Sequence, residues 1–311
     1  MRNRLVLVWL ISLLGIFVLS AEPRYYDYDL PSLVASPAAF QTRDLFFLPE
    51  EGGFLSATDF SFELQNSSLS DPNKTTSKGY SVFLDETLRY ALRDYLFLGI
   101  GFGFLSGRTE ELNSPAKLSY TYSGARDPSF FVLCRFIDQK NAPYFLDLKI
   151  NISPSLGQGL YSNALRGGHK IEGVLSLGQA IWDFEYKFGF HGAYYAFAKV
   201  QDGDEVVDQN SSYEWKISSL IQYDFNSKTS LDLGFDLSLP RKLQNKNSSD
   251  YEKPLYAVSV ELGPVHQFDD FLSASLKTYY SYELGDHFYS SKLYNQTIIG
   301  YGLKLNLNYA F

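Results

Sequence analysis

Apolar and polar residues alternate along most of the chain, from about residue 54 to its end. The last segment shows this most plainly, because every second residue from 299 to 311 is apolar and the residues between them are polar or small. Such an alternation predicts β-strands with one apolar and one polar face, whereas a helix repeats its apolar positions every three to four residues. The same alternation recurs at 144–152, 184–190 and 231–239. The pattern therefore predicts an all-β fold.

Twelve such segments can be delimited, and the connections between them alternate between short and long. We expect strands at 54–65, 80–92, 95–106, 128–139, 143–154, 169–178, 182–197, 212–225, 229–239, 255–268, 271–284 and 296–311. The five short connections are 93–94, 140–142, 179–181, 226–228 and 269–270. The six long connections are rich in Asn, Ser, Asp, Lys and Gly, as solvated loops are, and lie near 66–79, 107–127, 155–168, 198–211, 240–254 and 285–295.

Short turns at one end and long loops at the other are the plan of a transmembrane barrel. An even number of strands also places both ends of the barrel chain on the short-turn side. Many Tyr and Trp residues fall near strand ends, where the aromatic girdles of such barrels lie. We therefore expect a transmembrane antiparallel up-and-down β-barrel of about twelve strands over residues 54–311. A soluble sandwich is the alternative, because the period alone does not say which face is inside.

The first residues indicate secretion. Arg2 and Arg4 precede an apolar run, 5–19, that ends in the small residues Ser20 and Ala21. The run is shorter than the roughly 20 residues that a membrane-spanning helix needs, so we expect a cleaved signal peptide at 1–21. Residues 22–53 do not alternate and contain four prolines. We expect them to form an N-terminal segment that is periplasmic or folds into the lumen as a plug.

Composition narrows the class further. The formal net charge of −8 becomes about −10 without the signal peptide, which makes nucleic acid an unsuitable partner. After Ala21 no apolar window is long enough for a membrane helix, although 45% of the chain is hydrophobic and 17% is aromatic. The single Cys, Cys134, cannot form a disulfide within the chain.

The C-terminal strand resembles that of bacterial outer-membrane proteins, in which apolar residues alternate back from a terminal aromatic residue, often Phe. The matching positions here are Leu305, Leu307, Tyr309 and Phe311. The resemblance implies an outer-membrane location and recognition of this strand by the barrel-assembly machinery. A second stretch, 36–40, resembles the Asn-Pro-Ala stretch of the long-chain fatty-acid transporter family. The Asn is absent here, and those barrels have more strands.

In a barrel of this kind the polar face of each strand lines the lumen. Acidic and basic residues both occupy this face. Either they form ion pairs that close a narrow barrel, or acidic and basic clusters lie apart and create an electric field across the lumen that filters solutes. Small inward residues at Gly99, Gly101 and Gly103 would leave room for a plug or a passage. The candidate lumen-lining residues are Asp85, Arg89, Arg135, Asp147, Lys149, Glu185, Lys187, Lys216, Asp232, Asp236, Glu261, Lys277 and Lys304.

Twelve strands enclose only a small bore. We therefore expect a narrow outer-membrane channel for passive passage of small polar solutes, with membrane lipid as its surroundings. Only Arg89 and Arg135 are arginines on the lumen parity, which disfavours strongly anionic substrates. The alternative is a barrel with a blocked lumen whose long loops serve recognition.

Enzymatic signals are weak. The four His residues show no metal-binding spacing and no nucleophile motif, so we expect no metal, no cofactor and no enzymatic activity. An outer-membrane phospholipase is the enzymatic alternative, since His169 falls on the apolar parity at a strand end, but its Ser and Asn partners are missing. Glu86 would face lipid if the alternation held, so we expect a bulge between Phe83 and Thr87.

Overall fold

The structure is a computed structural model that describes residues 45, 47–70, 75–112, 119–137, 144–157, 168–181, 184–202, 205–239, 242–244, 251–289 and 292–311. All of them belong to the second of two compact units, which runs from residue 40 to the end of the chain. The expected signal peptide, 1–21, and residues 22–44 of the expected N-terminal segment lie outside the described residues. No helix in the described ranges is long and apolar enough to span a membrane.

The described residues are organised into β-strands. The strands are β1 (Phe54–Leu69), β2 (Thr76–Arg93), β3 (Leu96–Glu111), β4 (Ser119–Ala125), β5 (Ser129–Ile137), β6 (Phe145–Ser153), β7 (Lys170–Ile181), β8 (Phe184–Tyr195), β9 (Ala198–Asp202), β10 (Glu205–Gln209), β11 (Ser212–Asn226), β12 (Thr229–Leu239), β13 (Leu243–Gln244), β14 (Tyr251–Gln267), β15 (Leu272–Tyr289) and β16 (Lys292–Ala310).

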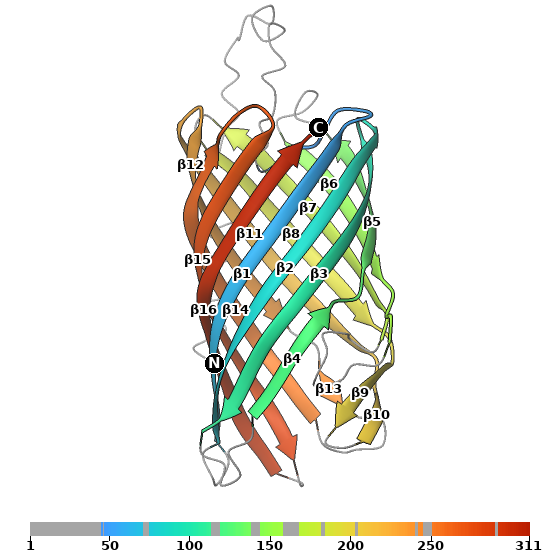
Figure 1. The fold of residues 1–311 in the computed structure, drawn as a ribbon, viewed down its shortest axis with the longest axis vertical. Coiled ribbons are helices and arrows are strands. Elements are labelled where there is room, and N and C mark those ends of the chain that lie inside the picture. Colours follow the sequence, from blue (N-terminus) through green and yellow to red (C-terminus); the bar gives the residue numbers. More distant parts are fainter. Residues whose placement is uncertain are drawn as a thin grey trace, which may run out of the picture. The chain divides into compact units, whose positions relative to one another are not determined.

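Twelve of these strands form one closed antiparallel barrel (Figure 1). Each pairs with its neighbour in the order β1, β2, β3, β5, β6, β7, β8, β11, β12, β14, β15 and β16, and β16 returns to β1. The closing pair runs in register from Leu55 opposite Ala310 to Leu69 opposite Gln296. A closed sheet has no free edge, so the expected fold class is confirmed.

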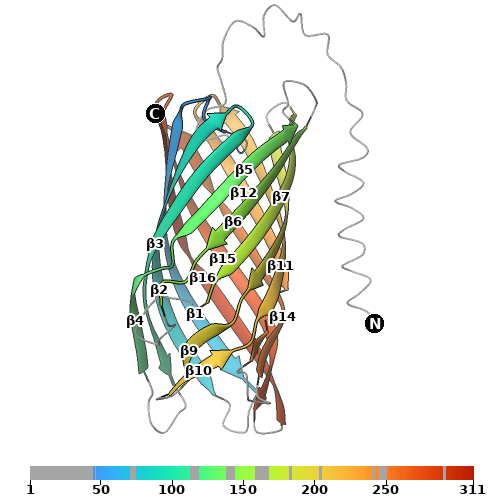
Figure 2. The same ribbon diagram turned by 90° about the vertical axis from the view of Figure 1, so that its right-hand side faces the viewer.

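The barrel strands correspond one to one with the twelve expected segments, but several extend further at the loop end. β15, for example, continues to Tyr289, and the expected loop at 107–127 contains β4, which pairs with β3 beyond β5. The expected loop at 198–211 contains the β9–β10 hairpin. Figure 2 shows this hairpin and β4 at the loop end of the barrel.

One expected turn is wrong. Residues 179–181 remain in strand β7 and pair with β8, ending with Ile181 opposite Phe184. The physical reason is that a connection of two residues is enough for an antiparallel hairpin, so the ladder extends as far as the pairing allows.

The two faces of the sheet differ in chemistry. Along β16 the outward side chains of Tyr301, Leu303, Leu305 and Leu307 are between 37% and 48% exposed. The ion pairs described below connect side chains of the opposite face, around the lumen. An apolar exterior around a charged interior is the arrangement of a membrane barrel and the reverse of a soluble one.

The largest fully buried side chains lie toward the short-turn end. Phe97 and Phe145 are fully buried there, each at the start of its strand. Six further buried residues lie just before or after a short connection or at the start of β1, namely Leu55, Ala91, Gln222, Ser230, Gln267 and Ser273, whereas Ser153, Ala193, Ala198, Gln209 and Ser212 are buried at the loop end. Gln222 donates a 2.6 Å hydrogen bond from Nε2 to Ser230 Oγ across the β11–β12 turn. Side chains therefore fill the barrel at this end.

Candidate functional site

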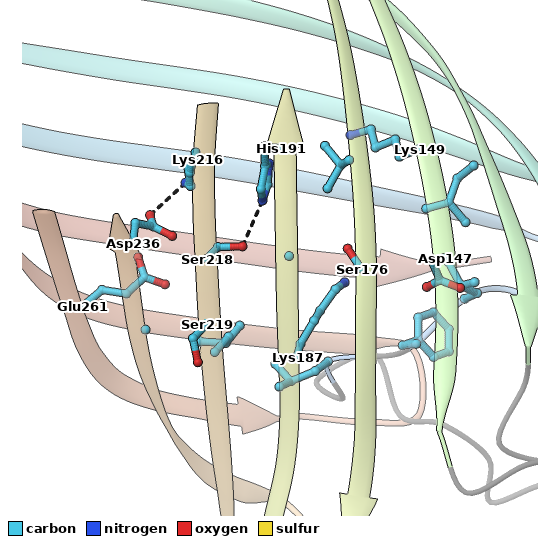
Figure 3. A pocket seen from close by; sticks show the side chains of 18 of the residues that line it. Asp147, Lys149, Ser176, Lys187, His191, Lys216, Ser218, Ser219, Asp236 and Glu261 are labelled. Carbon is cyan, nitrogen blue, oxygen red and sulfur yellow. Dashed lines mark hydrogen bonds and ion pairs between the residues drawn. The ribbon is translucent and has the colours of Figure 1, made fainter. Parts of the chain in front are cut away.

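A cavity of about 470 Å³ lies in the barrel lumen (Figure 3). Its lining side chains come from nine of the twelve barrel strands, namely β2, β5, β6, β7, β8, β11, β12, β14 and β16. Strands from all round a closed sheet can share one cavity only on the inside. Nine of the thirteen candidate residues line it: Arg89, Arg135, Asp147, Lys149, Lys187, Lys216, Asp236, Glu261 and Lys304.

Part of the N-terminal segment also lines this cavity. Leu45, Phe47 and Leu48, here called the plug residues, contribute an apolar portion of the lining. The backbone N–H of Leu45 donates a 2.9 Å hydrogen bond to Glu185 Oε2 on β8. Glu185, another of the candidate residues, therefore attaches the segment to the wall. Of the described part of residues 22–53, Leu45, Phe47 and Leu48 thus lie in the lumen.

The part of the cavity wall formed by β2, β5, β6 and β8 carries four cations. We call Arg89, Arg135, Lys149 and Lys187 the basic wall. Arg135 forms a bidentate pair with Asp147, through Nε at 2.9 Å and a terminal guanidinium nitrogen at 3.0 Å, and both side chains are buried. The other three cations make no ion pair within the described ranges. The basic wall therefore holds positive charge that its contacts do not neutralise.

Phe131 organises two of these cations. Lys149 Nζ lies 4.2 Å and the Arg89 guanidinium 5.8 Å from the centre of its ring, within the range of cation–π attraction. The ring itself covers Gly99 on β3, and a Cβ at that position would overlap the Phe131 ring. Gly99 therefore makes room for the ring that positions the basic wall. It was expected to widen the passage, and in the structure this space is filled.

The strands β11, β12, β14, β15 and β16 form the other part of the wall. We call six of its charged residues, which form ion pairs with one another, the balanced wall: Lys216, Asp232, Asp236, Glu261, Lys277 and Lys304. Lys216 pairs with Asp236 at 2.8 Å, Lys277 with Asp232 at 2.6 Å, and Lys304 with Glu261 at 2.8 Å. Lys277 also approaches Glu261 at 3.5 Å. Within this set three lysines match three carboxylates, so the set carries no excess charge.

Asp85 lies outside the cavity lining and pairs with an arginine that the strand pattern did not single out. Arg126, between β4 and β5, contacts both carboxylate oxygens of Asp85 at 2.7 Å. Gly103 leaves space for this pair, because a Cβ there would overlap the Asp85 carboxylate. Arg126 was missed because the expected strand began at residue 128, so the residue was assigned to a loop.

Two of the histidines, His191 and His169, make structural contacts. His191 on β8 lies 2.9 Å from Ser218 Oγ on β11, on the cavity wall (Figure 3). His169 Nδ1 accepts a 3.0 Å hydrogen bond from the backbone N–H of Ser155, whose own hydroxyl donates to Gly157 O. His169 Nδ1 therefore contacts the backbone of Ser155 and not its hydroxyl group. Among the described residues no group of three His, Cys, Asp or Glu side chains is arranged to hold a metal.

The expected bulge near Glu86 is wrong. The pairing of β2 with both β1 and β3 is regular through Glu86, and the irregularity in β2–β3 lies further on, between Ala91 and Arg93. Glu86 shares its face with Leu84 and accepts hydrogen bonds from two hydroxyls of β1, Ser56 Oγ at 2.5 Å and Thr58 Oγ1. Because these hydroxyls satisfy the outward carboxylate, the ladder does not have to break.

The proposed assembly residues lie on the outer face at the barrel seam. Leu305, Leu307, Tyr309 and Phe311 are all exposed. The terminal Phe311 and Phe54 exchange backbone hydrogen bonds of 2.7 and 3.0 Å, and their rings stack at 5.3 Å. The end of the alternating strand therefore closes the barrel beside its first residue.

Comparison with solved structures identifies the fold. The barrel is similar to the COG4313 outer membrane channel from Pseudomonas putida F1, with a TM-score of 0.58 and 14% sequence identity over 89% of this chain and 99% of that chain. A Pseudomonas aeruginosa FadL homologue aligns over 83% of this chain and 90% of its own, with a TM-score of 0.45 and 9% identity. No protein-family model and no curated protein sequence matches the chain. The chain has the fold of bacterial outer-membrane β-barrels.

Proposed function

We propose that this protein is an outer-membrane channel that lets small polar solutes pass through its lumen. The observation that carries the proposal is the 470 Å³ cavity inside a closed barrel, lined by charged side chains from nine strands. A lumen of this chemistry holds water and ions, and twelve strands keep it narrow. The Pseudomonas putida structure that shares the fold is described as an outer membrane channel, which supports the same role here.

Membrane insertion follows from the exterior of the barrel. Because the barrel is closed, the backbone N–H and C=O groups of neighbouring strands bond to one another, which is necessary where lipid hydrocarbon offers no partners. The outward face is apolar. On this proposal the signal peptide at 1–21 delivers the chain across the inner membrane, and the assembly machinery recognises Leu305, Leu307, Tyr309 and Phe311. Outer-membrane lipid then surrounds the barrel.

The plug residues and the packed short-turn end favour a second candidate, a barrel with a closed lumen whose loops serve recognition. Leu45, Phe47 and Leu48 occupy space in the lumen, and Phe97 and Phe145 are fully buried beside the short turns. Passage therefore requires the plug residues to move, whereas a recognition barrel would keep them in place.

Single-channel recording in planar bilayers separates the two candidates. We compare the chain from residue 22 with a variant that lacks 22–48. Residues 49–53 are retained because Gly52 N and Gly53 O bond to Ala91 on β2 and support the seam. We expect small discrete conductance steps from the longer chain and larger steps from the variant.

As a control, the heat-modifiable migration of both proteins on gels shows whether each is folded. If both are folded and neither conducts, the channel proposal is wrong and the recognition barrel replaces it. If only the shortened variant conducts, the lumen is a passage that the N-terminal segment closes.

A further inference from the structure

We propose that the basic wall is a binding site for a small monocarboxylate with a short apolar body. This inference rests on the proposed function, because it names the class of solute that the lumen selects. Three features of the cavity support it: the cations without an ion pair, the apolar lining and the volume.

The cations are arranged for an anion. Arg89, Lys149 and Lys187 line the cavity and make no ion pair in the part of the chain that the structure describes, and the Nε–H of Arg89 is buried with no acceptor there. A buried charge without a partner is costly, so such groups are retained where a ligand completes them. Figure 3 shows Lys149 and Lys187 extending from β6 and β8.

The neighbouring carboxylates do not cancel this charge. Asp147 is already bound in two places by Arg135, and Glu185 accepts a hydrogen bond from the Leu45 backbone. A third carboxylate near the basic wall, Glu172, acts on Lys149 but already pairs with Lys170 at 3.2 Å. The basic wall therefore has four cations beside carboxylates that already have partners, whereas the balanced wall contains equal numbers of cations and carboxylates. A mobile anion in the cavity is therefore drawn toward the basic wall.

The apolar lining selects the rest of the ligand. The plug residues and three strand residues, Leu133, Val174 and Leu220, line the same cavity. A volume of about 470 Å³ is in the range of small-ligand pockets, which combine apolar walls with a few polar groups that fix orientation. A ligand with a carboxylate beside the cations and an alkyl chain against these apolar residues fits both the basic and the apolar part of the lining. Inorganic phosphate would fit only the basic part.

Titration calorimetry of the purified chain from residue 22 in detergent tests the proposal with hexanoate as the probe. Hexylammonium has the same apolar body and the opposite charge, and inorganic phosphate has charge without an apolar body. We expect hexanoate to bind at least tenfold more tightly than either. Equal binding of hexylammonium, or equal binding of phosphate, would overturn the assignment.

Variants locate the site. K187M and, independently, K149M should weaken hexanoate binding at least tenfold. The matched control is K216M combined with D236N, which removes a lysine from the cavity without changing its net charge, and it should change binding less than threefold. Unchanged binding in both single variants, each folded by its migration on gels, would show that the site lies elsewhere.

Measuring the reversal potential in a potassium chloride gradient distinguishes a failure of the channel proposal from a failure of the basic-wall inference. The variant lacking 22–48 should conduct chloride in preference to potassium, and K149M with K187M should reverse or abolish this preference. A conducting barrel that prefers potassium contradicts the basic-wall inference and leaves the channel intact. Hexanoate binding that K187M abolishes in a barrel without conductance supports the site and contradicts the channel.

Discussion

The basic wall and the balanced wall lie in the same lumen and consist of the same kinds of side chain, but they differ in pairing. On the balanced wall each lysine contacts a carboxylate, and on the basic wall, within the part of the chain that the structure describes, only Arg135 does so. The number of charges in the lumen therefore does not determine its field. The field depends on which cations have a carboxylate within reach, and the strand register decides that.

The ion pairs also differ in burial, and this difference predicts how much each contributes. The Arg135–Asp147 side chains are 5% and 8% exposed, and those of Lys277 and Asp232 are 13% and 5% exposed. Lys216 and Asp236 are about one third exposed. Breaking a buried pair leaves a charge in a medium of low polarity, whereas water screens an exposed pair.

The largest effect is expected for Asp147→Asn, which makes the basic wall more unbalanced. Arg135 loses its bidentate partner while remaining buried, so the free energy of unfolding should fall by about 3–5 kcal/mol. Urea unfolding in lipid vesicles, followed by tryptophan fluorescence, measures this loss. Adding Arg135→Gln should restore part of it, because the charge that Asp147 balanced is then removed as well. If the double variant is less stable than the single one, the pair is not the cause.

A smaller loss is expected for Lys277→Gln, which breaks the balanced wall. Asp232 is buried, and without Lys277 it has no cation beside it, so the free energy of unfolding should fall by about 2 kcal/mol. The wall would also become negative. When Lys277→Gln is introduced into the variant lacking 22–48, the reversal potential should therefore move toward the equilibrium potential of potassium. A shift toward chloride would contradict the pairing.

Gly99→Ala tests the support of the basic wall without changing any charge. The added Cβ displaces the Phe131 ring, on which Arg89 and Lys149 lie, and overpacking of this kind costs about 1–3 kcal/mol. We expect weaker hexanoate binding together with the loss of stability. Gly173→Ala is the matched control, since a Cβ there meets no atom within 4 Å. Equal effects of the two substitutions would show that the Phe131 ring does not support the binding site.

The smallest effect on stability is expected for Asp236→Asn, which gives the balanced wall its first unpaired lysine. The pair is partly exposed, so unfolding should change by less than about 1 kcal/mol. Chloride preference should nevertheless increase, because Lys216 lines the cavity. An unchanged reversal potential would show that Lys216 lies outside the ion path.

The period-two pattern was sufficient to predict the barrel because alternation, strand number and loop length are local properties of the sequence. It placed the thirteen candidate lumen residues on the polar face, but it did not predict their partners. Whether Asp147 meets Arg135 or Lys187 depends on the register between β5, β6 and β8, which alternation does not fix. For the same reason, the number of inward arginines does not by itself give the charge of the lumen.

Two further features depend on tertiary contacts. The sequence left open whether residues 22–53 enter the barrel, because Leu45, Phe47 and Leu48 have no periodicity that indicates their surroundings. The alternation within β2 predicts that Glu86 disrupts its strand, because the pattern of one strand does not include the side chains of its neighbour. The two hydroxyls that hold it in place, on Ser56 and Thr58, lie thirty and twenty-eight residues earlier in the chain.

The concentration of buried residues beside the short turns has a consequence for how the strands come apart. Amide hydrogens near Phe97, Phe145 and Ser230 sit where side chains fill the cylinder, so these amides should exchange with deuterated water last. Those near β4 and the β9–β10 hairpin should exchange first. Opening would then proceed from one rim toward the other, with the tightly filled rim serving as the anchor from which the ladder re-forms.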